Sequence, residues 1–169
     1  MTTLSQLNAL SRDEFTRVVG PVFEHSPWIA EAAWVKRPFA GVEELHDALC
    51  QIVREATAEQ KLALIRAHPD LVGRAALAGT LTRESTGEQA SARLSNLSPE
   101  EVALFQKNNA AYQAKFGFPF VICARLNKKE AILAGFEARL HNSPEQEVAA
   151  ALEEIFKIAE LRLRDLMTS

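Results

Sequence analysis

Apolar residues recur at helical spacing along most of the chain. Three segments show this most clearly: Phe15, Val18, Val19 and Phe23; Val42, Leu45, Leu49, Ile52 and Val53; and Val148, Leu152, Ile155, Ala159 and Leu163. Recurrence every three or four residues places these side chains on one face of a helix. The pattern therefore predicts helices that each bury one face.

Serines mark where several of these helices begin. Ser11, Ser98 and Ser143 each stand three residues before a Glu or Gln. In such a capping box the serine oxygen accepts the backbone N–H of that residue, whose side chain reaches back to the serine amide. Pro99 and Pro144 occupy the first helical position, where the missing N–H of proline costs nothing. We therefore predict that helices begin directly after these three serines.

Only the run FVICA, residues 120–124, has the composition of a strand, and one short strand has no partner. The chain has neither an internal repeat nor a low-complexity linker. We therefore predict an all-α fold, a single compact domain over residues 1–169 with roughly seven or eight helices. Such a fold does not by itself indicate a function, which has to come from a site.

Composition excludes several classes of function. The net charge is −3, so no basic field is present to hold nucleic acid. Cys50 and Cys123 lie in apolar surroundings without Cys-x-x-Cys spacing, which predicts buried thiols in a reducing compartment. The N-terminus has no signal-peptide pattern, the C-terminal LMTS is not a peroxisomal address, and no apolar run could span a membrane. We expect a cytoplasmic protein that binds neither membrane nor nucleic acid.

His68 is the first candidate for chemistry. It precedes Pro69, which disfavours the α conformation of the residue before it, so the histidine falls at a helix boundary. It either ends one helix or caps the next. A fixed imidazole in such a position suits a general acid or base, whereas the simpler interpretation is a helix cap without a catalytic role.

The polar stretch STGEQ, residues 85–89, is the second candidate. Ser85 and Glu88 have the spacing of another capping box. However, Gly87 would then lie in the first helical turn, at a cost of about 1 kcal/mol relative to alanine. A glycine among Ser, Thr and Gln also fits a backbone that approaches a polar ligand. Both interpretations can hold, because the amides of a helix N-terminus suit an anionic ligand.

The segment KFGFPFVICARL, residues 115–126, is the third candidate. Gly117 is predicted to end the helix that begins after Ser98, as a left-handed C-cap. The Phe-Pro-Phe run that follows is either a buried connector or the wall of a pocket for a flat ring. Arg162 and Arg164 stand on the last predicted helix, where one arginine turned inward could clamp a carboxylate. No histidine has metal-ligand spacing, so the sequence proposes no metal site.

Taken together, LIRAHPDL, LTRESTGEQ and YQAKFGFPFVICAR resemble the OHCU decarboxylase family. Its members are 2-oxo-4-hydroxy-4-carboxy-5-ureidoimidazoline (OHCU) decarboxylases of uric-acid degradation. The resemblance extends from FTRVVGPVFEHSPWIAEAAW to EIFKIAELRLRDL, which is nearly the whole chain. It implies an all-helical homodimer that converts OHCU to (S)-allantoin and CO2 without a metal or organic cofactor.

The resemblance also implies a role for individual residues. The catalytic histidine corresponds to His68, with Glu88 as its acidic partner. An arginine of the last helix also faces the site; Arg162 fits this role better, with Arg164 as a rival. The residues implied to hold substrate are Pro69, Ser85, Thr86, Gly87, Glu88, Gln89, Phe120, Val121, Ile122, Cys123, Ala124 and Arg162.

Two other functions remain as alternatives. One is a non-catalytic helical module that binds a ligand or a partner. The other is a different enzyme on the same scaffold, such as a hydrolase of a related ureido compound. The presence of His68, Glu88 and Gln89 argues against the first, and the products formed would separate the second.

Overall fold

The computed structural model describes residues 2–94 and 96–167, apart from the side chains of residues 74 and 75. In this part of the chain there are ten α-helices and three short 3-10 helices, with no strand. The prediction of an all-α fold is confirmed. Eight of the α-helices have seven residues or more, while α1 (Leu4–Ala9) and α6 (Arg74–Ala78) are shorter.

The helices fall into two compact units. Unit 1 comprises Met1–Ala67 and Phe156–Ser169, and unit 2 comprises His68–Ile155. The long helix α10 (Pro144–Met167) contributes its first part to unit 2 and its last part to unit 1. Together the units cover the range over which the sequence predicts one domain.

Unit 1 contains α1, α2 (Arg12–Val19), α3 (Pro27–Ala33), α4 (Val42–Glu55) and α5 (Ala58–Ala67). Helix α3 contacts both α2 and α4. The apolar faces predicted from the sequence supply its core: Phe15, Val19, Leu45, Leu49 and Leu163 are fully buried. The residues that recur at helical spacing in the sequence therefore pack together in the core of unit 1.

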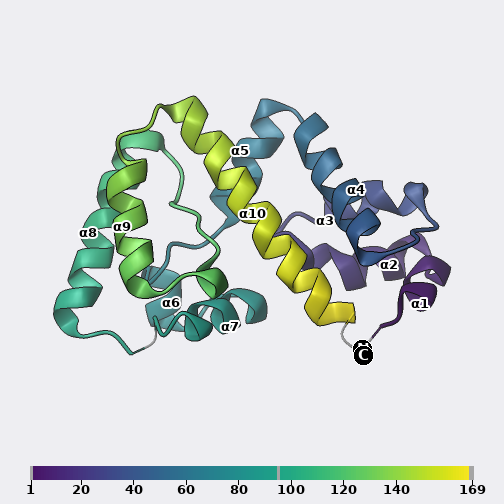
Figure 1. The fold of residues 1–169 in the computed structure, drawn as a ribbon, viewed down its shortest axis with the longest axis horizontal. Helices are drawn as coiled ribbons and strands as arrows, with labels where there is room; N and C mark the ends of the chain where they lie inside the picture. The colour runs from purple at the N-terminus through teal and green to yellow at the C-terminus, as the bar shows by residue number, and fades with distance from the viewer. Residues whose placement is uncertain (1, 95, 168–169) are drawn as a thin grey trace. The chain divides into compact units, whose positions relative to one another are not determined.

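Unit 2 contains α6, α7 (Arg83–Ser91), α8 (Pro99–Phe116) and α9 (Lys129–Arg139). Helices α8 and α9 lie side by side (Figure 1). Aromatic rings fill the space beside them: Phe120 stacks on Phe136 at 3.9 Å and meets Tyr112 edge-on at 5.3 Å between ring centroids. This aromatic core holds the end of α8 and the segment that follows it.

The predicted helix starts are confirmed. Ser11 and Ser98 form capping boxes with Glu14 and Glu101. Ser143 and Gln146 exchange the same pair of hydrogen bonds, at 2.9 and 3.2 Å. Thr3 and Thr57 form two further boxes with glutamines, which the serine pattern did not predict. Gly117 ends α8 in the left-handed conformation, with φ 75°.

The segment FVICA is not a strand. Residues 119–123 have no regular secondary structure, and 124–126 form the 3-10 helix η3 (Ala124–Leu126). Its apolar side chains instead contribute to the core: Phe120, Val121 and Cys123 are buried. The segment is therefore an irregular connection through apolar surroundings.

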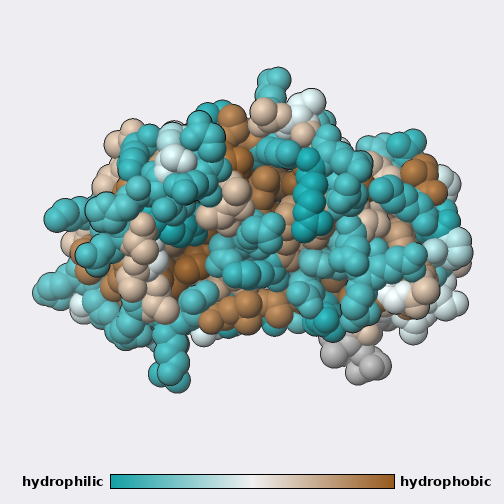
Figure 2. Space-filling model, turned by 45° about the horizontal axis from the view of Figure 1, so that its top comes forward, coloured by the Kyte–Doolittle hydropathy of each residue, from teal (hydrophilic) through white to brown (hydrophobic). Residues whose placement is uncertain are grey.

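Polar and charged residues cover most of the face shown in Figure 2, with hydrophobic residues in separate patches. Both cysteines are buried and outside any disulfide, as predicted. Among the described residues, no helix is long and apolar enough to cross a membrane.

Two glycines of unit 2, Gly87 and Gly117, should respond oppositely to alanine. Gly117 needs a positive φ, so Gly117→Ala should destabilise the protein by about 1–2 kcal/mol. Gly87 lies inside α7 with open space where a Cβ would stand, so Gly87→Ala should stabilise it by up to about 1 kcal/mol. Urea unfolding of both variants measures the two effects. Equal effects of the same sign would contradict this account of the two backbones.

Candidate active site

His68 directly follows the last residue of α5 and is buried, with 7% of its surface exposed. Of the two predicted positions, it therefore ends one helix and does not begin the next, which starts only at Arg74. Residues 71 and 72 form a turn, and Val72 has φ 53°. A β-branched residue is rarely found at positive φ. Such a backbone requires support from its surroundings.

Two amide side chains provide that support. Gln89 accepts a hydrogen bond from the Val72 amide at 3.0 Å and donates one to the Asp70 carbonyl at 3.4 Å. From the other side, Asn109 of α8 donates to the Leu71 carbonyl at 2.8 Å. The backbone of residues 70–72 is thus clamped between α7 and α8. We call this pair of side chains the amide clamp.

Helix α7 places the STGEQ residues on different faces. Its N-cap is Thr82, whose hydroxyl accepts from the Ser85 amide, so the helix begins three residues before the capping box considered at Ser85. Ser85 and Gln89, four residues apart, form the buried face. Glu88 is half-buried at its edge, while Thr86 and Gly87 are exposed. Of the polar stretch, Ser85, Glu88 and Gln89 thus face the protein.

The third segment meets the same helix. Helix α7 contacts η3, which directly follows residues 120–123. Burial raises the pKa of the Cys123 thiol, and the nearby carboxylates of Glu154 and Glu88 raise it further. Glu88 therefore lies within electrostatic range of Cys123. Unit 2 brings the turn after His68, the buried face of α7 and the 120–124 segment together around one helix.

The comparison with known proteins decides the family. The model of the family described as OHCU decarboxylase matches residues 8–164. The chain belongs to the OHCU decarboxylase family. The resemblance found in its motifs is confirmed.

Two relatives and one solved structure show how far the similarity extends. The chain is 43% identical to the 2-oxo-4-hydroxy-4-carboxy-5-ureidoimidazoline decarboxylase of Haloferax volcanii, over 99% of this chain and 97% of that protein. It is also 43% identical to the Amia calva protein of the same name, over 97% of this chain and 94% of that protein. A crystal structure of (S)-allantoin synthase superposes with a TM-score of 0.78 at 30% identity, over 98% of this chain and 54% of that one.

In this member of the OHCU decarboxylase family, the two arginines of the last helix are in different environments within unit 1. Arg162 is buried and donates to Glu24 at 2.9 Å and to the Pro21 carbonyl at 3.1 Å. Arg164 is exposed and pairs with Glu160 at 2.8 Å on the same helix. Arg162 is thus the buried one of the two, and its guanidinium is paired with Glu24 within unit 1.

The chemistry-bearing side chains form no evident cation site. Among the described residues, no group of three or more His, Cys, Asp or Glu side chains is arranged to hold a metal ion. Because its pKa is raised, the Cys123 thiol stays protonated near neutral pH.

Sequence reasoning missed several polar residues that hold the site in place. Asn109 supports the turn after His68, and Arg139, Glu147 and Glu154 support the 120–124 segment. Asn109 could have been found, since it lies between Phe105 and Tyr112 on the buried face of α8. A polar residue in that register has to find a hydrogen-bond partner inside the protein.

The amide clamp predicts a cost for removing Gln89. Gln89→Leu would keep the volume but leave the buried Val72 amide without its acceptor, at a cost of about 1–3 kcal/mol. Gln106→Leu on the exposed side of α8 is the control, with an expected change within about 0.5 kcal/mol. Urea unfolding compares the two. Equal stability of the Gln89 variant and the wild type would contradict the clamp.

The environment of the Asp70 carboxyl group predicts that the stability of the protein depends on pH. Burial raises the pKa of its carboxyl group, and its Oδ1 atom is buried without a hydrogen-bond partner among the described residues. A carboxyl group whose pKa is higher in the folded protein than in the unfolded chain binds its proton more tightly in the folded state. The protein therefore loses stability as the pH rises from about 4, the unfolded value, through the raised pKa.

Asp70→Asn cannot undergo this loss. The variant should gain stability relative to the wild type between pH 4 and pH 7, with the two converging at the acidic end. Urea midpoints at several pH values within this window would measure the difference. A constant difference between the two proteins across the window would contradict a raised pKa of the half-buried Asp70 carboxyl.

Proposed function

We propose that the protein catalyses the stereospecific decarboxylation of OHCU to (S)-allantoin and CO2, the last step from urate to allantoin. The observation that supports this most directly is the meeting of three family motifs in unit 2. The turn after His68 and η3, which begins at the end of the 120–124 segment, both contact α7. The names of the full-length relatives agree with this reaction.

The substrate supplies its own electron sink. In OHCU one ring carbon carries both a carboxylate and a hydroxyl, beside a ring C=N bond. When the bond to the carboxylate breaks, its electron pair forms a C=C bond, and the C=N electrons move to nitrogen, which takes up a proton. Protonation of the ring carbon that had belonged to the C=N bond and loss of the hydroxyl proton then give the ring amide carbonyl of allantoin. This chemistry needs no cofactor to accept electrons.

The protein then has to orient the carboxylate and move protons on one face of the ring. His68 is assigned the proton transfer, because a histidine titrates near neutral pH and can act in both directions. Glu88 would orient it or tune its charge. Ser85 and Gln89, with the backbone of residues 120–124, would hold the ring and the ureido group.

Four further assignments belong to this proposal. Pro69 lines the site, Thr86 and Gly87 contact substrate at the exposed side of α7, and Arg162 attracts the substrate carboxylate. Arginine suits that role because its guanidinium can bind both carboxylate oxygens. The working form is proposed to be a cytoplasmic homodimer.

His68→Asn tests the proposal. The substrate is generated in situ from urate by two upstream enzymes, and circular dichroism follows the formation of (S)-allantoin. Removing the proton shuttle should slow the reaction by at least about 100-fold while far-UV circular dichroism shows an intact fold. His141→Asn is the matched control, since His141 is exposed in the turn before α10 and should leave the rate unchanged.

Each other outcome has a definite meaning. Wild-type rates in a folded His68 variant would refute the assignment of the proton shuttle. If the wild type only followed the slow, optically silent decay of the substrate, the decarboxylase proposal would fail and a ligand-binding module would remain. Ring opening or ammonia release in place of CO2 would indicate the hydrolase.

A further inference from the structure

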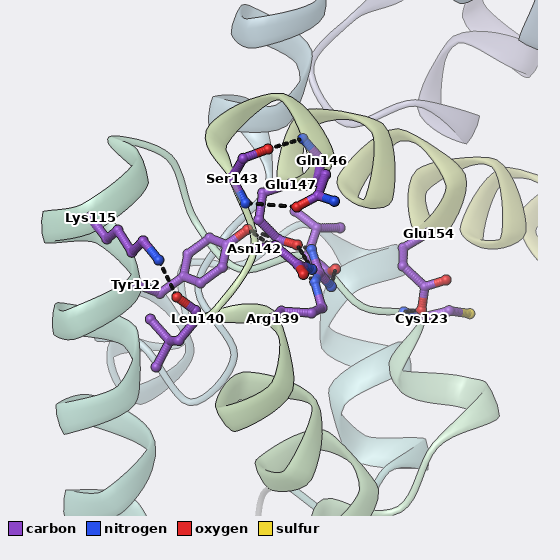
Figure 3. Close-up of polar contacts among 11 residues, drawn as sticks. Tyr112, Lys115, Cys123, Arg139, Leu140, Asn142, Ser143, Gln146, Glu147 and Glu154 are labelled. Carbon is purple, nitrogen blue, oxygen red and sulfur yellow. Dashed lines mark hydrogen bonds and ion pairs between the residues drawn. The ribbon is translucent and has the colours of Figure 1, made fainter.

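Residues 120–123 of the 120–124 segment lie outside any helix or sheet. One carbonyl and one amide of this segment are bound instead by side chains of neighbouring helices (Figure 3). The Val121 carbonyl accepts a hydrogen bond from Arg139 of α9 at 2.5 Å, and the Cys123 amide donates to Glu154 of α10 at 3.4 Å. The shorter of these two hydrogen bonds is the one that Arg139 donates.

Arg139 is itself held on several sides. Its Nε donates to Glu147 at 2.8 Å, and its guanidinium stacks on the Phe120 ring at 4.3 Å from the centroid. Only 13% of its side chain is exposed. The guanidinium therefore contacts the 120–124 segment twice, once through a ring and once through a carbonyl. A planar group with several fixed donors is required to make both contacts while keeping its ion pair.

Glu147 sets the direction of the guanidinium. Its carboxylate is fully buried and accepts from the Tyr112 hydroxyl at 2.5 Å and from Asn142 at 2.9 Å, besides Arg139 (Figure 3). Burial and the hydrogen bond to Glu147 raise the pKa of Tyr112, so its hydroxyl remains a donor at working pH. Three donors thus fix one carboxylate, and that carboxylate fixes Arg139.

Stability alone does not require this arrangement. Replacing a buried ion pair by apolar residues of similar volume is often neutral or even stabilising, because both charges lose their hydration. What a packed apolar cluster could not do is donate a hydrogen bond to the Val121 carbonyl. What the Arg139–Glu147 pair specifically provides is the orientation of the Val121 carbonyl.

We propose that Arg139 is a positioning residue of the OHCU site. It acts through the Val121 carbonyl and the Phe120 ring to hold the 120–124 backbone in the conformation that binds the substrate ring, and Glu147 and Tyr112 hold Arg139 in turn. This inference rests on the proposed function, in which that backbone contacts the substrate.

Arg139→Lys tests the inference on the full-length protein. Lysine keeps the positive charge beside Glu147 but cannot also donate to Val121 and stack on Phe120. The KM for OHCU should rise by about 10-fold or more, while kcat changes less, because binding by the displaced backbone is what is lost. Affinity for (S)-allantoin, measured by calorimetry without turnover, should fall by a similar factor.

A purely structural role would give a different pattern. If the substitution only unfolded part of the protein, apparent kcat would fall with the active fraction and KM would stay constant. Arg12→Lys, in the exposed pair with Glu31 at 3.1 Å, is the matched control and should change neither constant. Should Arg139→Lys fail to fold, Tyr112→Phe removes one donor to Glu147 with the ring retained, and a smaller rise in KM is expected.

The outcomes separate the inference from the proposed function. An unchanged KM and unchanged (S)-allantoin affinity in a folded Arg139 or Tyr112 variant would overturn the positioning role, although wild-type turnover would still support the decarboxylase. If the wild type did not accelerate decarboxylation, the proposed function would fail, and the positioning role would fail with it.

Discussion

The burial of the Glu147 carboxylate is the constraint on which much of unit 2 depends. A carboxylate removed from water needs a countercharge and several hydrogen-bond donors, because an uncompensated buried charge is very costly. Glu147 lies in the first turn of α10, where the helix dipole favours a negative charge. Arg139, Tyr112 and Asn142 supply the remaining compensation from α9, α8 and the turn between α9 and α10. Satisfying one charge thus ties three helices to one another and to the segment that Arg139 reaches.

The two irregular segments of the candidate site are held by different chemistry. The turn after His68 is clamped by the neutral amides of Gln89 and Asn109, whereas residues 120–124 are held by the charged side chains of Arg139 and Glu154. Both solutions follow from the same requirement, since a buried backbone outside helices and sheets needs partners for its polar groups.

Local features of the sequence predicted local features of the structure. Ser11, Ser98 and Gly117 could be read correctly, because a cap depends on residues only a few positions away. The N-cap of α7 was harder to predict, because both Thr82 and Ser85 have hydroxyl groups that can cap a helix. The structure shows that Thr82 is the N-cap. The family motifs located the candidate site, whereas the residues that support it were missed. Asn109 and Leu71 are 38 positions apart, and Tyr112 and Glu147 are 35 apart, so no local pattern could pair them.

The proposed chemistry explains why so much of the structure is devoted to holding backbone. Because OHCU can absorb the electrons released by decarboxylation, the protein has no need to supply a strong electron acceptor. Its contribution has to come from orienting the substrate and delivering a proton to one face, and orientation is effective only when the binding groups themselves do not move. A backbone carbonyl fixed by a guanidinium, and a turn fixed by two amides, meet that requirement at positions where regular secondary structure is absent. The Arg139–Glu147 pair is therefore better understood through the precision it gives to residues 120–124 than through the stability of the fold.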